Sequence, residues 1–141
     1  MGRKAMNIDR IIGLLSSTVV AALLYGSAAH AHHSFAGTYR EGDLLRLEGT
    51  IVQFNIRNPH SFINIEVIDE DGNKVLWGGE WGSVSALSQG GVDRFTLKAG
   101  EHIIIEGSPP RDTMDRKVLV RRVVRPATDN VEEFVWEGTF R

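Results

Sequence analysis

Four histidines follow residue 31, and they are the side chains of this chain best suited to chemistry. They are His32, His33, His60 and His102. If the chain begins at His32, its free amine and the Nδ1 atom of its own imidazole can chelate one metal ion. A third nitrogen from His60 would complete a T-shaped site, and a nitrogen-rich, tetragonal set favours Cu(II). We therefore predict a copper site at His32 and His60, with His33 as an auxiliary ligand.

The free amine requires removal of a leader, and residues 1–31 have the pattern of a secretory signal peptide. Basic residues near the start precede an uncharged, mostly apolar run over residues 11–24 and a stretch of small residues. The peptidase rule is satisfied after Ala31, which we favour, or after Ala29. The second cut leaves a histidine in the third position, which is also an amino-terminal copper chelator. We expect a periplasmic or secreted protein without a stable membrane anchor, since a spanning helix needs about 20 apolar residues.

Each histidine also has a plain structural interpretation. In this alternative, His32 and His33 are solvated, and His60 satisfies backbone groups in a turn. We expect His102 to share a strand face with Ile104, as a rim or core residue rather than a ligand. Structural zinc is disfavoured, because the chain lacks the Cys and His spacing of such sites.

A metal-free alternative uses aromatic residues of the predicted sheet. Trp77, Trp81 and Trp136 are candidates for a platform that holds a small ligand, a glycan or an envelope protein, as OB-folds often do. In a domain this small, however, tryptophan is more often part of the core. Glu80 either orients a liganding histidine or is an exposed strand carboxylate, and the exposed position is the safer expectation.

The composition after residue 31 limits the classes of partner. The leader holds three basic residues and one acidic residue, which leaves 13 basic and 17 acidic residues and a net charge of −4. The one basic cluster lies between Arg121 and Arg125 and is too small for a nucleic-acid footprint. The remaining 110 residues suffice for one core. The chain contains no cysteine, so no disulfide supports that core.

Enzyme signatures are missing from the sequence. It contains no Gly-x-Ser-x-Gly elbow, His-Glu-x-x-His helix, phosphate loop or dinucleotide fingerprint. We therefore expect a binding protein rather than an enzyme. An oxidative copper enzyme built on the same N-terminal histidine is the one exception.

Short alternating segments separated by turn residues predict a β-rich domain. The first strand runs from Leu45 to Ile56, with a change of phase at Gly49-Thr50 that indicates a bulge. Ser83 is expected to cap a helix of one or two turns that ends at Gly90-Gly91. Further strands are expected at residues 63–67, 74–81, 102–106 and 117–124, with an added edge strand within residues 131–140.

Five strands with a short helix between the third and the fourth are the layout of an OB-fold, a small, partly open Greek-key barrel. We therefore predict an all-β, OB-fold-like barrel with one short helix, formed by residues 32–141 as a single domain. A generic β-sandwich is the competing fold.

Several motifs resemble those of a family of small exported bacterial proteins of unknown function. They are His32-His33-Ser34-Phe35-Ala36, Asn58-Pro59-His60, Trp77 with Glu80, and Leu97-x-x-Gly100. The resemblance covers nearly all of the chain after residue 31. It implies a periplasmic, β-barrel-like domain and carries no established activity.

Overall fold

The computed structural model describes residues 33–138. The chain divides into two compact units, residues 1–37 and residues 38–141. A short helix, α2 (His33–Thr38), spans the end of the first unit, and all the strands belong to the second. The predicted leader boundary at Ala31 lies outside the described residues. Within the described part of the chain, no helix is long and apolar enough to cross a membrane.

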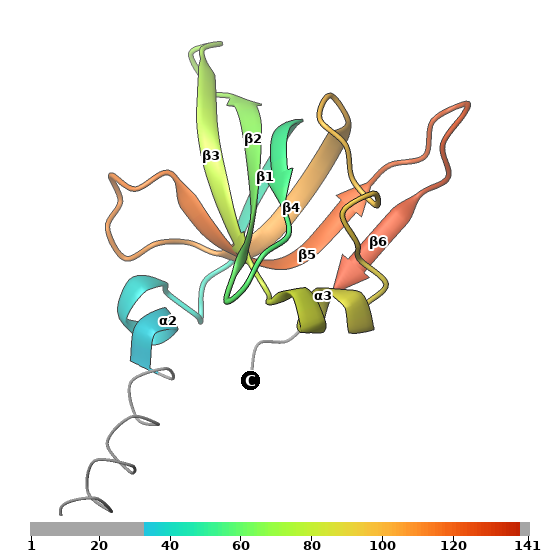
Figure 1. Cartoon of the computed structure of the whole chain (residues 1–141). Coiled ribbons are helices and arrows are strands. Elements are labelled where there is room, and N and C mark those ends of the chain that lie inside the picture. The colour runs from blue at the N-terminus through green and yellow to red at the C-terminus, as the bar shows by residue number, and fades with distance from the viewer. Residues whose placement is uncertain (1–32, 139–141) are drawn as a thin grey trace, which may run out of the picture. The chain divides into compact units, whose positions relative to one another are not determined.

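The second unit is built from six strands (Figure 1). They are β1 (Leu45–Asn55), β2 (Ser61–Ile68), β3 (Lys74–Trp81), β4 (His102–Ser108), β5 (Lys117–Arg125) and β6 (Phe134–Glu137).

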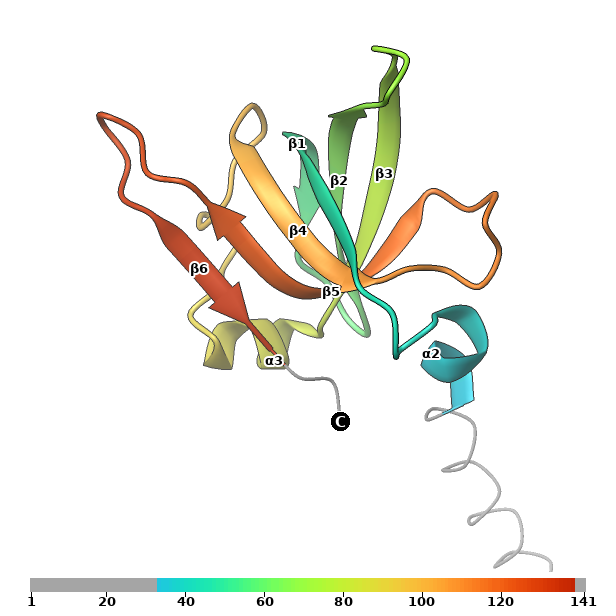
Figure 2. The same cartoon turned by 180° about the vertical axis from the view of Figure 1, so that it is seen from behind.

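The strands lie in the order β3-β2-β1-β4-β5-β6. A parallel pairing of residues 78–80 of β3 with residues 117–119 of β5 closes the first five strands into a barrel. Strand β6 pairs with β5 outside that closure (Figure 2). This order confirms the predicted OB-fold-like barrel, and the sheet closes on itself rather than forming a sandwich.

Alternating residues of the strands fill the barrel, because successive side chains of a strand point to opposite faces. Ile63 and Ile65 of β2 and Ile103 and Ile105 of β4 are fully buried. Helix α3 (Val84–Gln89) covers one end of the barrel (Figure 1) and inserts Leu87 into the core. The core also contains Leu47, Ile51, Trp81, Val92, Leu97, Val118, Val120, Val123 and Trp136.

Helix α3 begins and ends as predicted. The side chain of Ser83 accepts a hydrogen bond from the backbone N–H of Ala86 at 3.3 Å. This bond satisfies one of the amide groups that the first turn of a helix leaves without a partner. Gly90 follows as the C-cap, and its N–H returns to carbonyls of the last turn. The local signals at both ends are therefore sufficient to define the helix.

The bulge in β1 lies three residues later than expected. The register against β2 shifts between Ile51 and Gln53, so the alternation changes at Val52. The prediction at Gly49-Thr50 is therefore wrong. Gly49 faces inward, and a Cβ there would lie 2.3 Å from the carbonyl oxygen of Glu66. The glycine permits β2 to approach closely instead of marking the bulge.

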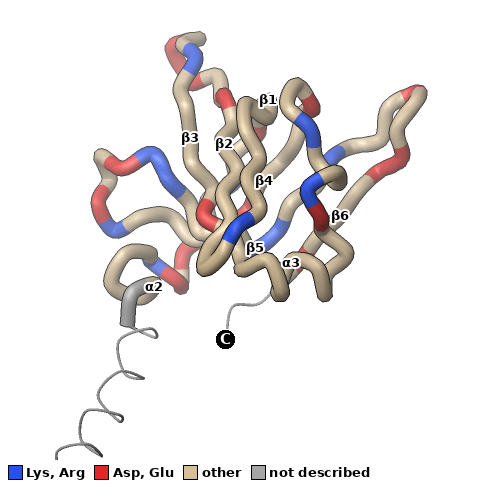
Figure 3. Tube along the Cα trace, in the orientation of Figure 1, with Lys and Arg blue, Asp and Glu red and all other residues tan. Residues whose placement is uncertain are grey.

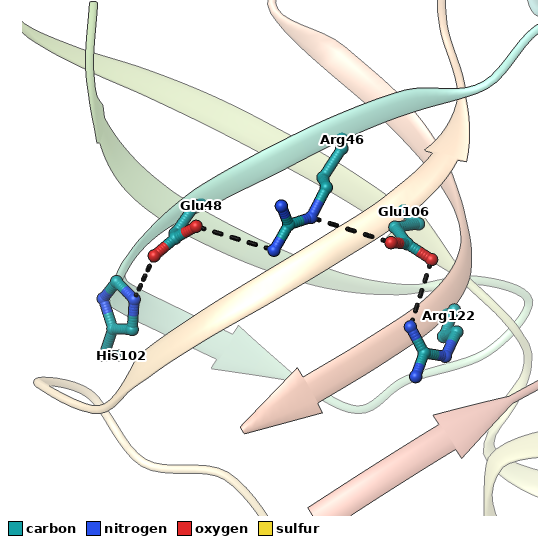
Figure 4. Close-up of polar contacts among 5 residues, drawn as sticks. All are labelled: Arg46, Glu48, His102, Glu106 and Arg122. Atoms are coloured by element: carbon teal, nitrogen blue, oxygen red, sulfur yellow. Dashed lines mark hydrogen bonds and ion pairs between the residues drawn. The ribbon is translucent and has the colours of Figure 1, made fainter. Parts of the chain in front are cut away.

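Acidic and basic residues are interspersed along the chain (Figure 3). One ladder crosses the outer face of β1, β4 and β5 (Figure 4). It links His102 to Glu48 at 3.0 Å, Glu48 to Arg46, Arg46 to Glu106, and Glu106 to Arg122 at 3.2 Å. His102 thus lies on the outer surface of β4, on the same face as Ile104 as predicted, while Ile103 and Ile105 point inward.

Candidate functional site

The Asn-Pro-His turn, residues 58–60, connects β1 to β2 and is fixed at both ends. The side-chain oxygen of Asn58 accepts a hydrogen bond from the backbone N–H of Val84, the first residue of α3, at 3.1 Å. The hydroxyl of Ser61 accepts from the N–H of Arg57 at 3.2 Å and donates to the carbonyl of the same residue at 3.3 Å. The Asn58-Pro59 peptide bond is cis. His60 therefore projects from a turn whose backbone position is well defined.

The carboxylate of Glu80 connects His60 to Tyr39. Nδ1 of His60 lies 2.5 Å from Oε1 of Glu80, and the hydroxyl of Tyr39 donates a hydrogen bond to Oε2 at 2.6 Å. Glu80 lies on β3, where its neighbour across the pair of strands is Phe62 of β2. Three segments that are distant in the sequence therefore meet at one carboxylate, which we call the Tyr39-Glu80-His60 relay.

Tyr39 is the most deeply buried member of the relay, with 1% of its surface exposed. Backbone contacts hold its segment in place, because Tyr39 forms a β-bridge with Pro110 and Arg40 donates to the carbonyl of Pro109 at 2.9 Å. Burial, followed by the hydrogen bond to Glu80, raises the pKa of Tyr39. The phenol therefore remains protonated and donates to the carboxylate at neutral pH.

The relay fixes which nitrogen of His60 faces away from Glu80. An ionised carboxylate only accepts hydrogen bonds, so the proton of the ring lies on Nδ1, toward Glu80. A metal ion would therefore bind Nε2. Histidines that ligate metals characteristically donate their other ring nitrogen to a carboxylate or a carbonyl, which fixes the ring and raises its basicity.

Glu80 differs from the exposed strand carboxylate that the sequence favoured. Its side chain is 19% exposed, and each of its oxygens has a partner in the relay. The sequence also offered the other role for Glu80, a carboxylate beside a histidine, and the geometry fits that role. The side chain of His60 is 33% exposed, so the imidazole is accessible from outside the barrel.

The described residues supply part of the predicted ligand set. His32 lies outside them, and His33 is the first residue of α2, with its side chain also outside the described part. Over the range that is described, no three His, Cys, Asp or Glu side chains form a group that could hold a metal ion. Of the three predicted ligands, only His60 has its side chain within the described residues.

Comparison with known protein families places residues 20–118 in a family of unknown function, DUF6152. The chain belongs to the DUF6152 family. This result confirms the resemblance inferred from the motifs. No curated protein matches the chain.

The DUF6152 match contains the entire relay. Tyr39, the Asn-Pro-His turn and Glu80 all lie within residues 20–118, as do the histidines at 32 and 33. The match ends at Val118, the second residue of β5. Most of β5 and all of β6 therefore lie beyond it.

The three tryptophans of the predicted platform have different environments within the DUF6152 barrel, and Trp136, like Trp81, is buried in the core. Trp81 is completely buried, with its ring 5.8 Å from that of Phe54 and 4.9 Å from that of Trp136. It belongs to the core and cannot contact a ligand on the surface, so its assignment to a platform is wrong. Trp77 is half-buried, and the guanidinium of Arg116 lies 5.6 Å from its ring centre.

Sequence reasoning missed Tyr39 as a member of the site. It is 41 residues from Glu80, so no local spacing connects them. A weak signal was available, because Tyr39 is the one tyrosine after residue 31 and lies four positions after the end of the His-His-Ser-Phe segment. Arg57 and Phe62 were also missed. With residues 58–60 they line a shallow depression of about 350 Å³ beside His60.

Proposed function

We propose that this protein is an exported, non-enzymatic binding protein that holds Cu(II) with His60 and with His32 as the first residue of the processed chain. The amine and Nδ1 of His32 and Nε2 of His60 form the three-nitrogen set, with His33 as an auxiliary ligand. The observation that carries the proposal is the 2.5 Å contact between His60 and Glu80. It provides the orientation and the basicity that a metal-binding imidazole requires.

Chain length limits how far His32 can be from the relay. His32 lies seven positions before Tyr39, so even a fully extended segment between them spans at most about 25 Å. The hydroxyl of Tyr39 is itself bound to the carboxylate that holds His60. A tethered amine therefore has a high effective concentration at His60 compared with the same group free in solution.

The proposed donors also select the metal. An amine and imidazoles are nitrogen ligands that suit Cu(II), and for a given site Cu(II) binds more tightly than Ni(II) or Zn(II). Cleavage after Ala29 would instead place His32 third in the chain. Copper would then bind through the terminal amine, the intervening amides and that histidine. The mass of the secreted protein distinguishes the two chains.

Calorimetric titration of Cu(II) into the processed protein tests the proposal. We expect one equivalent of Cu(II) to bind. In two variants we expect the affinity for Cu(II) to fall by at least about tenfold, the effect typical of losing support at a metal site. One carries an additional alanine before His32, and the other is His60→Ala. His102→Ala is the matched control, since His102 lies on the outer face of β4 and should leave the affinity unchanged.

Two results would contradict the proposal. Equal affinity with and without the added alanine would exclude the terminal amine, and equal affinity in His60→Ala would exclude the relay as part of the site. If the processed protein does not bind copper at all, the function that remains is the metal-free module, which holds a small ligand, a glycan or an envelope protein on the barrel surface.

A further inference from the structure

Two amide side chains are joined on the outer face of β1 and β2. Gln53 of β1 lies opposite Asn64 of β2, and Nδ2 of Asn64 donates a hydrogen bond to Oε1 of Gln53 at 3.2 Å. We call these two side chains the amide pair. Within residues 33–138, Nε2 of Gln53 and Oδ1 of Asn64 form no other side-chain hydrogen bond. The amide pair therefore presents both a donor and an acceptor to a ligand.

A glycine leaves the amide pair uncovered. Gly78 of β3 is the neighbour of Asn64 on the side away from β1. A Cβ at Gly78 would lie 3.5 Å from Oδ1 of Asn64, so a larger side chain at this position would extend across the amide. With glycine there, the oxygen remains accessible from outside the barrel.

Arg57 places a guanidinium at the same end of this face. Its guanidinium carbon lies 4.7 Å from the centre of the Phe62 ring, and the residue is exposed. In the part of the chain that the structure describes, no carboxylate is within ion-pair distance of this group. The backbone N–H of Arg57 is bonded to the hydroxyl of Ser61, so the turn holds the residue before any ligand arrives. Arg57 is therefore pre-organised to bind an anion.

Phe62 brings the guanidinium and the amide pair close together. Phe62 and Asn64 are alternate residues of β2, so their side chains leave the same face of the sheet, about 7 Å apart. Residues 51–65 contain one arginine or lysine and no aspartate or glutamate (Figure 3). The neighbouring carboxylates are already engaged, Glu80 in the relay and Glu66 in an ion pair at 2.7 Å. One cation and two neutral amides thus lie within the span of one small molecule.

We infer that this face binds a sugar acid, whose carboxylate forms a bidentate pair with Arg57 and whose hydroxyl groups bind the amide pair. Carboxylate matches the fork of arginine, and sugar hydroxyls both donate and accept hydrogen bonds, as the amide pair does. Pro59 and Phe62, which line the depression of about 350 Å³ beside Arg57, provide apolar surface for the carbon atoms of the ring. None of these groups is a proposed copper ligand, so the site does not depend on metal.

Nuclear magnetic resonance of the isotope-labelled, processed protein without added metal tests the inference. D-Glucuronate and D-galacturonate are the probes. We expect saturable shifts of the side-chain amide signals of Gln53 and Asn64 and of the Nε–H signal of Arg57. D-Glucose, which lacks the carboxylate, and acetate, which lacks the hydroxyls, should each bind at least about tenfold more weakly, because each loses one set of hydrogen bonds.

Two variants remove the two halves of the site separately. In Arg57→Gln the affinity for the sugar acids should fall by about tenfold or more, the effect of losing a charged hydrogen-bonded pair, and should approach that for glucose. Gly78→Val should also weaken binding, because its side chain covers Oδ1 of Asn64. The added Cβ makes contacts of ordinary length only, so we expect this variant to fold, and its spectrum verifies this.

Arg94→Gln is the matched control. The guanidinium of Arg94 lies 4.8 Å from the ring of Phe95, so the variant loses the same charge and the same kind of stacking. Arg94 lines a different depression, which contains Ile56 and Val84 but not Arg57. The sugar acids should therefore bind to this variant as they do to the wild type.

Each part of the inference has its own contrary result. Equal affinity for glucuronate and glucose, or equal affinity in Arg57→Gln and Arg94→Gln, would exclude the pair between carboxylate and arginine. Acetate that binds as tightly as the sugar acids would exclude the amide pair. If neither sugar acid produces a saturable shift, the whole inference is wrong. Should Gly78→Val fail to fold, the comparison of Arg57→Gln with Arg94→Gln still decides.

Discussion

Nδ1 of His60 lies 2.5 Å from Oε1 of Glu80, and this contact joins the turn after β1 to the C-terminal end of the third strand of the barrel. The contact has a consequence for metal affinity. Replacing Glu80 with glutamine removes the charge that polarises the imidazole, while the shape of the side chain is kept. We expect Glu80→Gln to weaken Cu(II) binding by about tenfold, as is typical when a residue that supports a metal ligand is changed.

Glu106→Gln provides the control for this measurement. Glu106 is also a strand carboxylate with partners on both oxygens, Arg46 and Arg122, but it belongs to the surface ladder. Calorimetric titration should give the wild-type affinity for this variant. Unchanged affinity in Glu80→Gln as well would show that Glu80 does not support a metal-binding histidine.

Tyr39 should remain protonated well beyond the pH at which a free tyrosine ionises. Its pKa is raised above the ordinary value of 10.0, first by burial and then by the hydrogen bond to Glu80. Since Tyr39 is the one tyrosine after residue 31, the ultraviolet absorbance of tyrosinate reports it alone in the processed protein. We expect no tyrosinate signal near pH 10, and a signal at higher pH that coincides with unfolding.

The raised pKa also fixes the direction of the stability change. The folded state retains the phenolic proton more strongly than the unfolded state does, so stability is fully present below pH 10 and is lost as pH rises above it. In Tyr39→Phe this component of the alkaline loss should disappear, and stability at neutral pH should fall by about 1 to 2 kcal/mol because Glu80 loses a donor. Denaturant titrations at neutral and alkaline pH measure both effects. If instead Tyr39 ionised near pH 10 in the folded protein, as a free tyrosine does, the buried hydrogen bond to Glu80 would be excluded.

Local signals in the sequence were sufficient for several elements. Strand β3 has the predicted bounds, Lys74–Trp81, because a polar turn precedes it and the cap of α3 follows it. Helix α3 was predicted from Ser83 and Gly90, whose effects act within a few residues. The order of the elements then indicated the barrel, since few folds place a short helix between a third and a fourth strand.

Contacts between distant segments could not be predicted in the same way. The glycine at 49 was interpreted as a bulge because its neighbours along the chain suggested a change of phase, whereas its role is set by Glu66 on another strand. The hydrogen bond between Tyr39 and Glu80 depends on how the segment around Pro110 packs. The chemistry of His60 and Glu80 was visible in their residue types, but the contact between them required the fold.

Gly107 should be essential for the pairing of β4 with β5. A Cβ at this position would lie 2.1 Å from the carbonyl oxygen of Leu119 and 2.8 Å from a methyl group of Val118. Neither the strand backbone nor the packed valine can move away without cost, so Gly107→Ala should destabilise the fold by at least about 2 kcal/mol. Gly42→Ala is the control, since nothing lies within 4 Å of the added Cβ. Equal denaturation midpoints for the two variants would contradict the close strand approach.

Trp81 and Trp77 should differ in their effect on stability, although they lie on the same strand. Trp81 is fully buried between Phe54 and Trp136, so Trp81→Ala should cost about 3 to 5 kcal/mol, as removal of large core side chains does. Trp77 is half-buried, and its replacement leaves a smaller void. Trp77→Ala should therefore cost clearly less in chemical denaturation. Since a domain has about 5 to 15 kcal/mol of stability in total, Trp81→Ala should also reduce the folded yield. A small loss for Trp81→Ala would mean that its ring is not part of the core and would restore it as a candidate for ligand contact.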